Sequence, residues 1–323
     1  MNKTVRFLSF PSLIFSVSMA ALTVCAFYAA SLDEFRDNLN YLTAFNGIQT
    51  ASSPQALWKA YVGGIGAYEP LFFVALILFA SLGWPAFLVF KNSLLIYCII
   101  YFCRLGLYSG DKPMGAWSRR LLILALFSDF YLLVLFFELH KLGLSLAILA
   151  FLSAIRVTWL KSVILASFGH FQTLLFIPLF IKVQLSGYRL GKILGGITLL
   201  STALIGLVMG GGFLFEGGLS KFAYYFSNRD NFGTGWQTLV LGVVAVLVFY
   251  RYYYNYLGVL LFFFVVYIVG YFVGYSRITF PLYWLVLYGL IFSNMDELKK
   301  YMLCAPLIIY NFYRVFIYIS GVS

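Results

Sequence analysis

The sequence predicts an all-α protein, a polytopic bundle of transmembrane helices. The chain is 63% hydrophobic and only 10% charged, whereas soluble domains carry about 25% charged residues. Apolar runs of about 17–25 residues, the length that crosses a bilayer, recur along the whole chain. Runs such as 193–214 and 257–273 are continuously apolar, whereas the strands of a membrane barrel alternate apolar and polar residues. Because backbone groups in hydrocarbon must be satisfied internally, helices are the remaining solution.

We expect one integral membrane domain over residues 1–323, with about 10–11 spans, one or two of them half-helices. The first apolar stretch follows Lys3 and Arg6 and is too long for a signal-peptide core, so it is interpreted as an anchored span. The predicted spans lie near residues 7–30, 85–106, 120–137, 142–156, 160–182, 193–214, 236–255, 256–275, 279–294 and 301–318.

Charge predicts which loops face the cytoplasm. Lysine and arginine cluster at 104–120, 156–161, 182–192 and 299–300, and such clusters mark cytoplasmic loops by the positive-inside rule. Two longer polar stretches, about 31–68 and 215–235, have nearly balanced charge, and we predict that they are external loops.

Two segments do not fit simple crossings. The apolar piece 71–82 before Gly83-Trp84-Pro85 is only about half a span long. Segment 157–182 has basic residues on both flanks, and a break at Gly169-His170 would reconcile these flanks with one membrane side. Irregular backbone at membrane depth persists only where it is buried in protein or lines a cavity. The two breaks therefore predict an internal cavity that faces outward.

Ionisable residues near these breaks are the candidate functional groups, since each costs about 2.5–3.5 kcal/mol or more at mid-bilayer. Structural explanations compete with this interpretation: a snorkelling lysine for Lys91, a carboxylate at a helix N-terminus for Glu69, and a hydrogen-bonded structural residue for His170. Converging cations suit a phosphate or pyrophosphate, and an acid or histidine beside them suits general-base catalysis. The residues expected to line this chamber are Glu69, Lys91, His140, Lys141, His170, Arg229 and Arg277.

Several functional classes are disfavoured. The net charge of +11 is explained by cytoplasmic loops, and no run of basic and aromatic residues resembles a nucleic-acid groove. The four cysteines form no CxxC pair, and the outward-facing carboxylates are scattered. No HExxH, P-loop, GxSxG or dinucleotide-binding fingerprint is present. We therefore predict a reaction that uses no metal and no cofactor, and no nucleic-acid partner.

Five segments, taken in order, resemble the Wzy/EpsG-type polymerases of bacterial O-antigen, capsule and exopolysaccharide. Two features depart from that family: its usual Gly-Thr-Asp-Tyr is absent from the first loop, and His140-Lys141 replaces Arg-Gln. This replacement keeps positive charge but loses the bidentate fork of arginine. The segments that carry the resemblance are Ser31–Asp37, Glu69-Pro70-Leu71-Phe72-Phe73, His140–Ala147, Lys161 through Phe168-Gly169-His170-Phe171 to Pro178, and Ser276-Arg277-Ile278.

The resemblance implies a GT-C-like membrane glycosyltransferase of the bacterial inner membrane with a periplasmic active site. Such enzymes transfer a growing glycan from undecaprenyl pyrophosphate to a hydroxyl of the next lipid-linked repeat unit. The expected partners are this lipid-linked oligosaccharide, the bilayer and a chain-length regulator protein. Arg277 and Lys141, supported by Lys91, are expected at the pyrophosphate, with His170 or Glu69 as the base. His140, Arg229 and Asp33 are expected to be further substrate contacts.

Three other functions remain open at this point. Broken helices with buried charges also occur in transporters, so a lipid-linked oligosaccharide flippase is one alternative. An O-antigen ligase shares the chemistry and differs only in its acceptor. A non-enzymatic membrane scaffold would need none of the candidate residues for its function.

Overall fold

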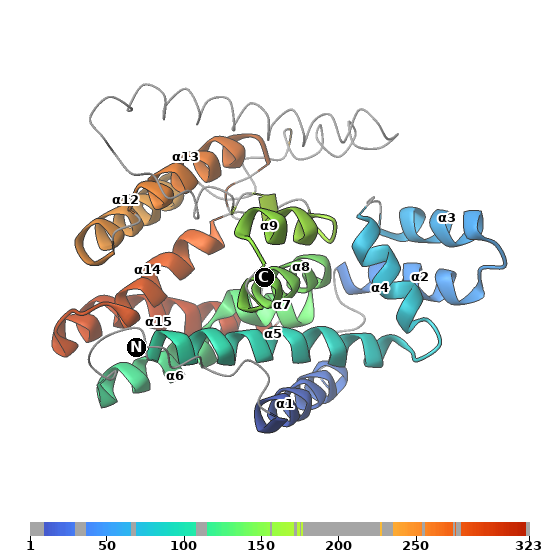
Figure 1. Cartoon of the computed structure of the whole chain (residues 1–323), viewed down its shortest axis with the longest axis horizontal. Coiled ribbons are helices and arrows are strands. Elements are labelled where there is room, and N and C mark those ends of the chain that lie inside the picture. The colour runs from blue at the N-terminus through green and yellow to red at the C-terminus, as the bar shows by residue number, and fades with distance from the viewer. Residues whose placement is uncertain are drawn as a thin grey trace. The chain divides into compact units, whose positions relative to one another are not determined.

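A computed structural model describes residues 10–29, 37–65, 69–107, 115–155, 157–170, 173–174, 176, 227, 235–253, 256–273, 275 and 279–320. Within these ranges every regular element is a helix and none is a strand (Figure 1). The predicted all-α class is therefore confirmed. The helices are α1 Phe10–Ala29, α2 Asp37–Thr50, α3 Pro54–Ile65, α4 Pro70–Phe79, α5 Trp84–Leu107, α6 Ala116–Ser128, α7 Phe130–Phe137, α8 His140–Ala154, α9 Trp159–Ser167, α12 Gly235–Tyr252, α13 Tyr256–Val273, α14 Phe280–Phe292 and α15 Glu297–Ser320.

Several of these helices have the length and composition of membrane spans. In the described ranges four helices qualify, namely α1, α5, α12 and α15, and the number rises to six if two bent helix pairs each form one span. The chain is thus an α-helical membrane protein. The total of about 10–11 spans remains a prediction, because the predicted span 193–214 lies outside the described residues.

The chain folds into two compact units, the first formed by residues 1–113 and 130–173. In this unit α1 and α8 pack against the long helix α5, and α8 also contacts α7 and α9 (Figure 1). Helices α2 and α3 form a hairpin, and α4 contacts both α2 and α5. The first unit therefore combines membrane-length helices with a hairpin from the predicted first external loop.

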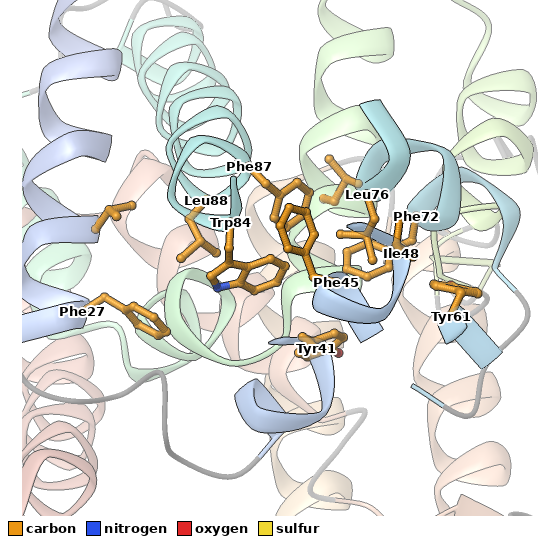
Figure 2. Packing of buried hydrophobic residues seen from close by; sticks show 12 residues of the cluster. Phe27, Tyr41, Phe45, Ile48, Tyr61, Phe72, Leu76, Trp84, Phe87 and Leu88 are labelled. Carbon is orange, nitrogen blue, oxygen red and sulfur yellow. The ribbon is translucent and has the colours of Figure 1, made fainter. Parts of the chain in front are cut away.

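Aromatic side chains form the core that attaches this hairpin to the first unit. Figure 2 shows Tyr41 and Phe45 of α2 beside Trp84 and Phe87 of α5, all of them buried. Tyr41 stacks on Trp84, with ring centroids 6.4 Å apart, and Phe72 of α4 meets Phe87 edge to face at 5.7 Å. Such aromatic pairs add about 0.5–1.5 kcal/mol each beyond the area they bury. This packing fixes the hairpin next to the start of α4.

The second unit contains residues 114–129 and 174–323. Helix α12 packs on α13 and α14, and α15 packs on α6 and α14. Polar contacts join α6 to the start of α15, where Ser118 Oγ donates to the Glu297 carboxylate at 2.8 Å. Lys300 Nζ donates to the same Ser118 oxygen at 2.9 Å. The prediction of one membrane domain over the whole chain stays a prediction.

The structure also differs from the sequence-based expectations. The predicted span 120–137 is broken at Asp129, which has extended backbone (φ −70°, ψ 97°) and whose buried carboxylate accepts a 2.8 Å hydrogen bond from the Tyr288 hydroxyl. A buried carboxylate needs such partners, and this need favours the break. In addition, the described part of the predicted loop 31–68 forms two helices, α2 and α3.

The predicted short helix is α4, which is ten residues long. It is followed by a turn in which Gly83 has a φ of 92°, a left-handed conformation that glycine adopts without steric cost. Helix α9 ends at Ser167, directly before the predicted break at Gly169-His170.

Candidate active site

Glu69 lies at the start of α4, between α3 and α4 and outside both helices. Pro70 opens α4, and the Glu69 side chain makes no capping hydrogen bond to its own helix. Its backbone carbonyl accepts hydrogen bonds from Phe73 N at 3.2 Å and from the Tyr61 hydroxyl at 2.9 Å. Glu69 is only 4% exposed. The backbone contacts hold the residue in place and leave its carboxylate to partners from elsewhere in the chain.

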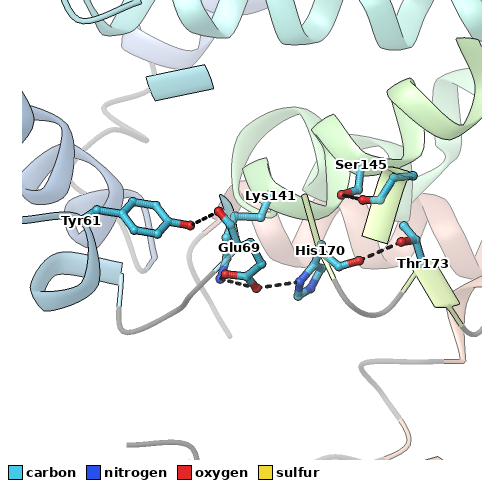
Figure 3. Close-up of polar contacts among 7 residues, drawn as sticks. Tyr61, Glu69, Lys141, Ser145, His170 and Thr173 are labelled. Atoms are coloured by element: carbon cyan, nitrogen blue, oxygen red, sulfur yellow. Dashed lines mark hydrogen bonds and ion pairs between the residues drawn. The ribbon is translucent and has the colours of Figure 1, made fainter. Parts of the chain in front are cut away.

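Lys141 is the first of these partners. It lies in the first turn of α8, and its Nζ is 3.3 Å and 3.4 Å from the two carboxylate oxygens of Glu69 (Figure 3). A cation in the first turn of a helix is disfavoured by the helix dipole, and the Glu69 carboxylate offsets this cost. The ion pair joins the beginnings of α4 and α8 through two residues that are 72 positions apart in the sequence.

His170 is the second partner, and its Nδ1 lies 3.2 Å from Glu69 Oε1 (Figure 3). It reaches the carboxylate because the turn after α9 docks on α4, where Leu71 N donates to Phe168 O at 3.0 Å. Gly169 also lets the same turn lie close to α8, since a Cβ there would clash with Ser145 Oγ of that helix. The His170 side chain is 22% exposed, so the imidazole lies at the accessible side of the cluster.

The Glu69 carboxylate is held in its ionised form. Burial by itself raises the pKa of Glu69, but the hydrogen bond from His170 and the electrostatic interactions with Lys141 and His170 outweigh burial and lower this pKa to about 2. A carboxylate with so low a pKa is a weak base near neutral pH. Of the two bases expected from the sequence, the geometry therefore favours His170, with Glu69 as the group that orients its ring.

Lys91 and His140 form a second, fully buried polar cluster. Lys91 Nζ lies 2.8 Å and 2.9 Å from the carbonyls of Leu135 and Phe136 and 2.9 Å from His140 Nδ1. His140 Nε2 lies 2.7 Å from Asn38 Oδ1. Both Lys91 and His140 are 0% exposed. These two predicted substrate contacts therefore lie together, and in this conformation both are enclosed by protein.

The remaining predicted residues, Asp33, Arg229 and Arg277, lie outside the described residues, and their assignments stay predictions. Among the described residues, no group of three or more His, Cys, Asp and Glu side chains is placed to hold a metal ion.

Two residues near the site were not singled out from the sequence. Tyr61 holds the Glu69 carbonyl, and Asn38 contacts His140. Each is a common residue type in a polar segment, without a motif around it. Only the position of both in the predicted first loop, which precedes the Glu69-Pro70 motif, gave any signal.

The arrangement suits chemistry on an anionic substrate. The beginnings of α4 and α8, together with the Lys141 ammonium, meet at one point, and helix N-termini favour negative charge. A histidine whose Nδ1 is held by a carboxylate is oriented to exchange a proton through Nε2. Comparison with protein-family models, with curated proteins and with solved structures gave no match. The resemblance to Wzy/EpsG-type polymerases therefore rests on the motifs alone.

Proposed function

We propose that this protein is a membrane glycosyltransferase that polymerises undecaprenyl-pyrophosphate-linked oligosaccharides into a surface polysaccharide. The observation that carries the proposal is the convergence of Glu69, Lys141 and His170. These three residues come from three of the motifs that resemble the polymerase family. Lys141 lies 72 residues, and His170 101 residues, from Glu69 along the chain. Distant motifs that form one ion-paired cluster are expected of a shared site.

The proposed reaction needs a base and a cation at different atoms. His170 Nε2 takes the proton of the acceptor hydroxyl, while Glu69 holds Nδ1 and stabilises the imidazolium that forms. The acceptor oxygen then bonds to the anomeric carbon of the donor glycan, and the bond to the pyrophosphate oxygen breaks. Lys141 stabilises the negative charge that develops on the departing pyrophosphate. Arg277 is proposed to assist there, and the site is proposed to face the periplasm.

Deletion of the gene in its host tests the function. Surface polysaccharide is separated on a gel, where glycans with different numbers of repeat units form a ladder of bands. Loss of this ladder with one repeat unit left on the acceptor supports a polymerase. Loss of all surface glycan indicates a flippase or a ligase, and an unchanged ladder contradicts a role in polysaccharide assembly.

Complementation of the deletion strain tests the site. Plasmids carrying His170→Ala or Lys141→Met should fail to restore the ladder. Lys59→Ala is the matched control, because Lys59 is exposed on the hairpin helix α3 and belongs to neither polar cluster. A full ladder from His170→Ala at normal protein levels would contradict the assignment of the base.

A further inference from the structure

Lys91 has a complete set of hydrogen bonds inside the first unit. A lysine ammonium has three N–H donors, and three acceptors lie within 2.9 Å of Nζ: the carbonyls of Leu135 and Phe136, and His140 Nδ1. Its side chain comes from the first third of the membrane-length helix α5. With every donor used and 0% exposure, Lys91 has no donor left for a pyrophosphate in this conformation.

The charge of Lys91 meets the end of a helix. Leu135 and Phe136 belong to the last turn of α7, where unpaired carbonyls carry a partial negative charge. A buried ammonium loses several kcal/mol of hydration, and these contacts offset only part of that loss. Such a costly residue within a membrane protein is expected to have a function.

His140 transmits this contact to α8. Because a lysine ammonium only donates, Nδ1 of His140 accepts and Nε2 carries the proton that it donates to Asn38 of α2. The ring also packs edge to face on Tyr41 and Trp84, at 5.1 Å and 5.2 Å between centroids. The His140 ring is thus fixed on several sides. Since successive residues of a helix point about 100° apart, fixing His140 also fixes the direction of Lys141.

Gly143 gives independent support for a tight junction between α7 and α8. A Cβ at this position would lie 2.8 Å from the Leu135 carbonyl oxygen and 3.7 Å from Lys91 Cδ. The first turn of α8 therefore lies directly against the α7 carbonyls that Lys91 binds. Any larger residue at position 143 would push this turn away from Lys91.

We propose that Lys91 is a positioning residue whose ammonium, held between the α7 carbonyls and His140, fixes the α7–α8 junction so that Lys141 faces Glu69. This role rests on the proposed function only in treating the Glu69–Lys141 pair as functional. The Asn38 contact extends the same network to the α2–α3 hairpin. Lys91 acts on the site through Lys141 and makes no contact with substrate.

A double-mutant cycle on the purified, detergent-solubilised full chain tests this role. Thermal unfolding is measured for Glu69→Gln, Lys141→Met and the double variant, first in the parent chain and then with Lys91→Met added. In the parent chain the effects of the two substitutions on stability should be non-additive, because each substitution breaks the same ion pair. When Lys91→Met is also present, these effects should become additive. Non-additivity that persists unchanged in the Lys91→Met chain would overturn the proposal.

A matched control separates positioning from general loss of stability. Lys300 is also a buried lysine, 5% exposed, but it lies in the second unit on Ser118. Lys300→Met should lower the unfolding temperature and leave the non-additivity of Glu69 and Lys141 intact. If Lys91→Met yields no folded protein, the cycle is repeated with Asn38→Ala, which removes the contact of Asn38 with His140 at the edge of the network. The non-additivity between Glu69→Gln and Lys141→Met should then fall at least by half, and an unchanged value contradicts the proposal.

The cycle requires no glycan substrate, so it remains valid if the polymerase function fails. Where polymerisation is measurable, Lys91→Met should lower kcat more than tenfold and change KM for the lipid-linked donor less than threefold. A residue that binds the pyrophosphate of the donor equally in the ground state and the transition state would instead raise KM.

Discussion

The two histidines of the first unit show how environment divides roles between identical side chains. Both nitrogens of His140 are engaged, by Lys91 and by Asn38, and the residue is 0% exposed. His170 is held at Nδ1 by Glu69 and is 22% exposed. Proton transfer needs a ring that substrate can reach. His170 therefore meets the requirement for a base, and His140 serves the packing of α8.

Acid should destabilise the protein in a way that depends on Glu69. Its pKa falls from an ordinary value near 4.5 to about 2 on folding, so its contribution is present above pH 4.5 and is lost as pH falls toward 2. This difference corresponds to about 3 kcal/mol. Thermal unfolding at pH 6 and pH 3 should therefore show a larger loss for the parent chain than for Glu69→Gln. Equal losses in both chains would contradict the ion-paired state of this carboxylate.

Tyr61 should stabilise the site through its hydroxyl alone. Tyr61→Phe removes the hydrogen bond to the Glu69 carbonyl and keeps the buried ring, so the expected destabilisation is about 1 kcal/mol. Chemical unfolding measures this change. Tyr253→Phe, which removes a comparable hydrogen bond from a tyrosine hydroxyl to the Gly289 carbonyl in the second unit, gives the comparison. The activity of Tyr61→Phe should decrease more than that of Tyr253→Phe.

At the scale of elements, the site depends on how closely helix ends approach one another. Helix α9 ends against α8, where Ser145 Oγ donates to the Ala166 carbonyl at 2.9 Å. The following turn then reaches α4 through the Phe168 carbonyl. Three helices are joined within a few residues, and His170 is carried to Glu69 by this junction.

Gly169→Ala should weaken that junction. The added Cβ would clash with Ser145 Oγ and lie 3.3 Å from the Ala166 carbonyl oxygen, and overpacking of this kind costs about 1–3 kcal/mol. We expect a lower unfolding temperature and lower activity. Adding Ser145→Ala removes the clashing oxygen but also its hydrogen bond to the Ala166 carbonyl, so Gly169→Ala should cost less stability in the Ser145→Ala chain than in the parent chain. An equal cost in both chains would mean that the alanine acts elsewhere.

At the scale of the whole molecule, the sequence predicts the class of fold better than it predicts the site. Helices α1, α5, α12 and α15 follow directly from long apolar runs, because hydropathy reflects a local solvent preference. The break at Asp129 and the Lys91 network depend on partners far along the chain, such as Asn38, which is 102 residues from His140. No local pattern reports such contacts. Glu69, Lys141 and His170 were identified because ionisable residues in a membrane protein are costly, and the family resemblance then gave them their expected roles.

The orientation in the membrane is a prediction for the whole chain. With the four native cysteines replaced by serine, Lys59→Cys in the predicted external loop should react with a membrane-impermeant maleimide in intact cells. Lys299→Cys, in a predicted cytoplasmic cluster and exposed at the start of α15, should react only after the cells are opened. Both substitutions replace exposed lysines, so they are matched in reactivity. Labelling of both in intact cells would contradict the predicted sidedness.

The adjacent positions 140 and 141 have an evolutionary consequence. His140 contacts Lys91 and Asn38, whereas Lys141 contacts Glu69, so neighbouring residues are constrained by different, distant partners. In homologous chains, position 140 should covary with positions 91 and 38, and position 141 with position 69, as two independent sets. A chain that carries Arg-Gln at this place is therefore expected to have exchanged its residues at 91 and 38 as well.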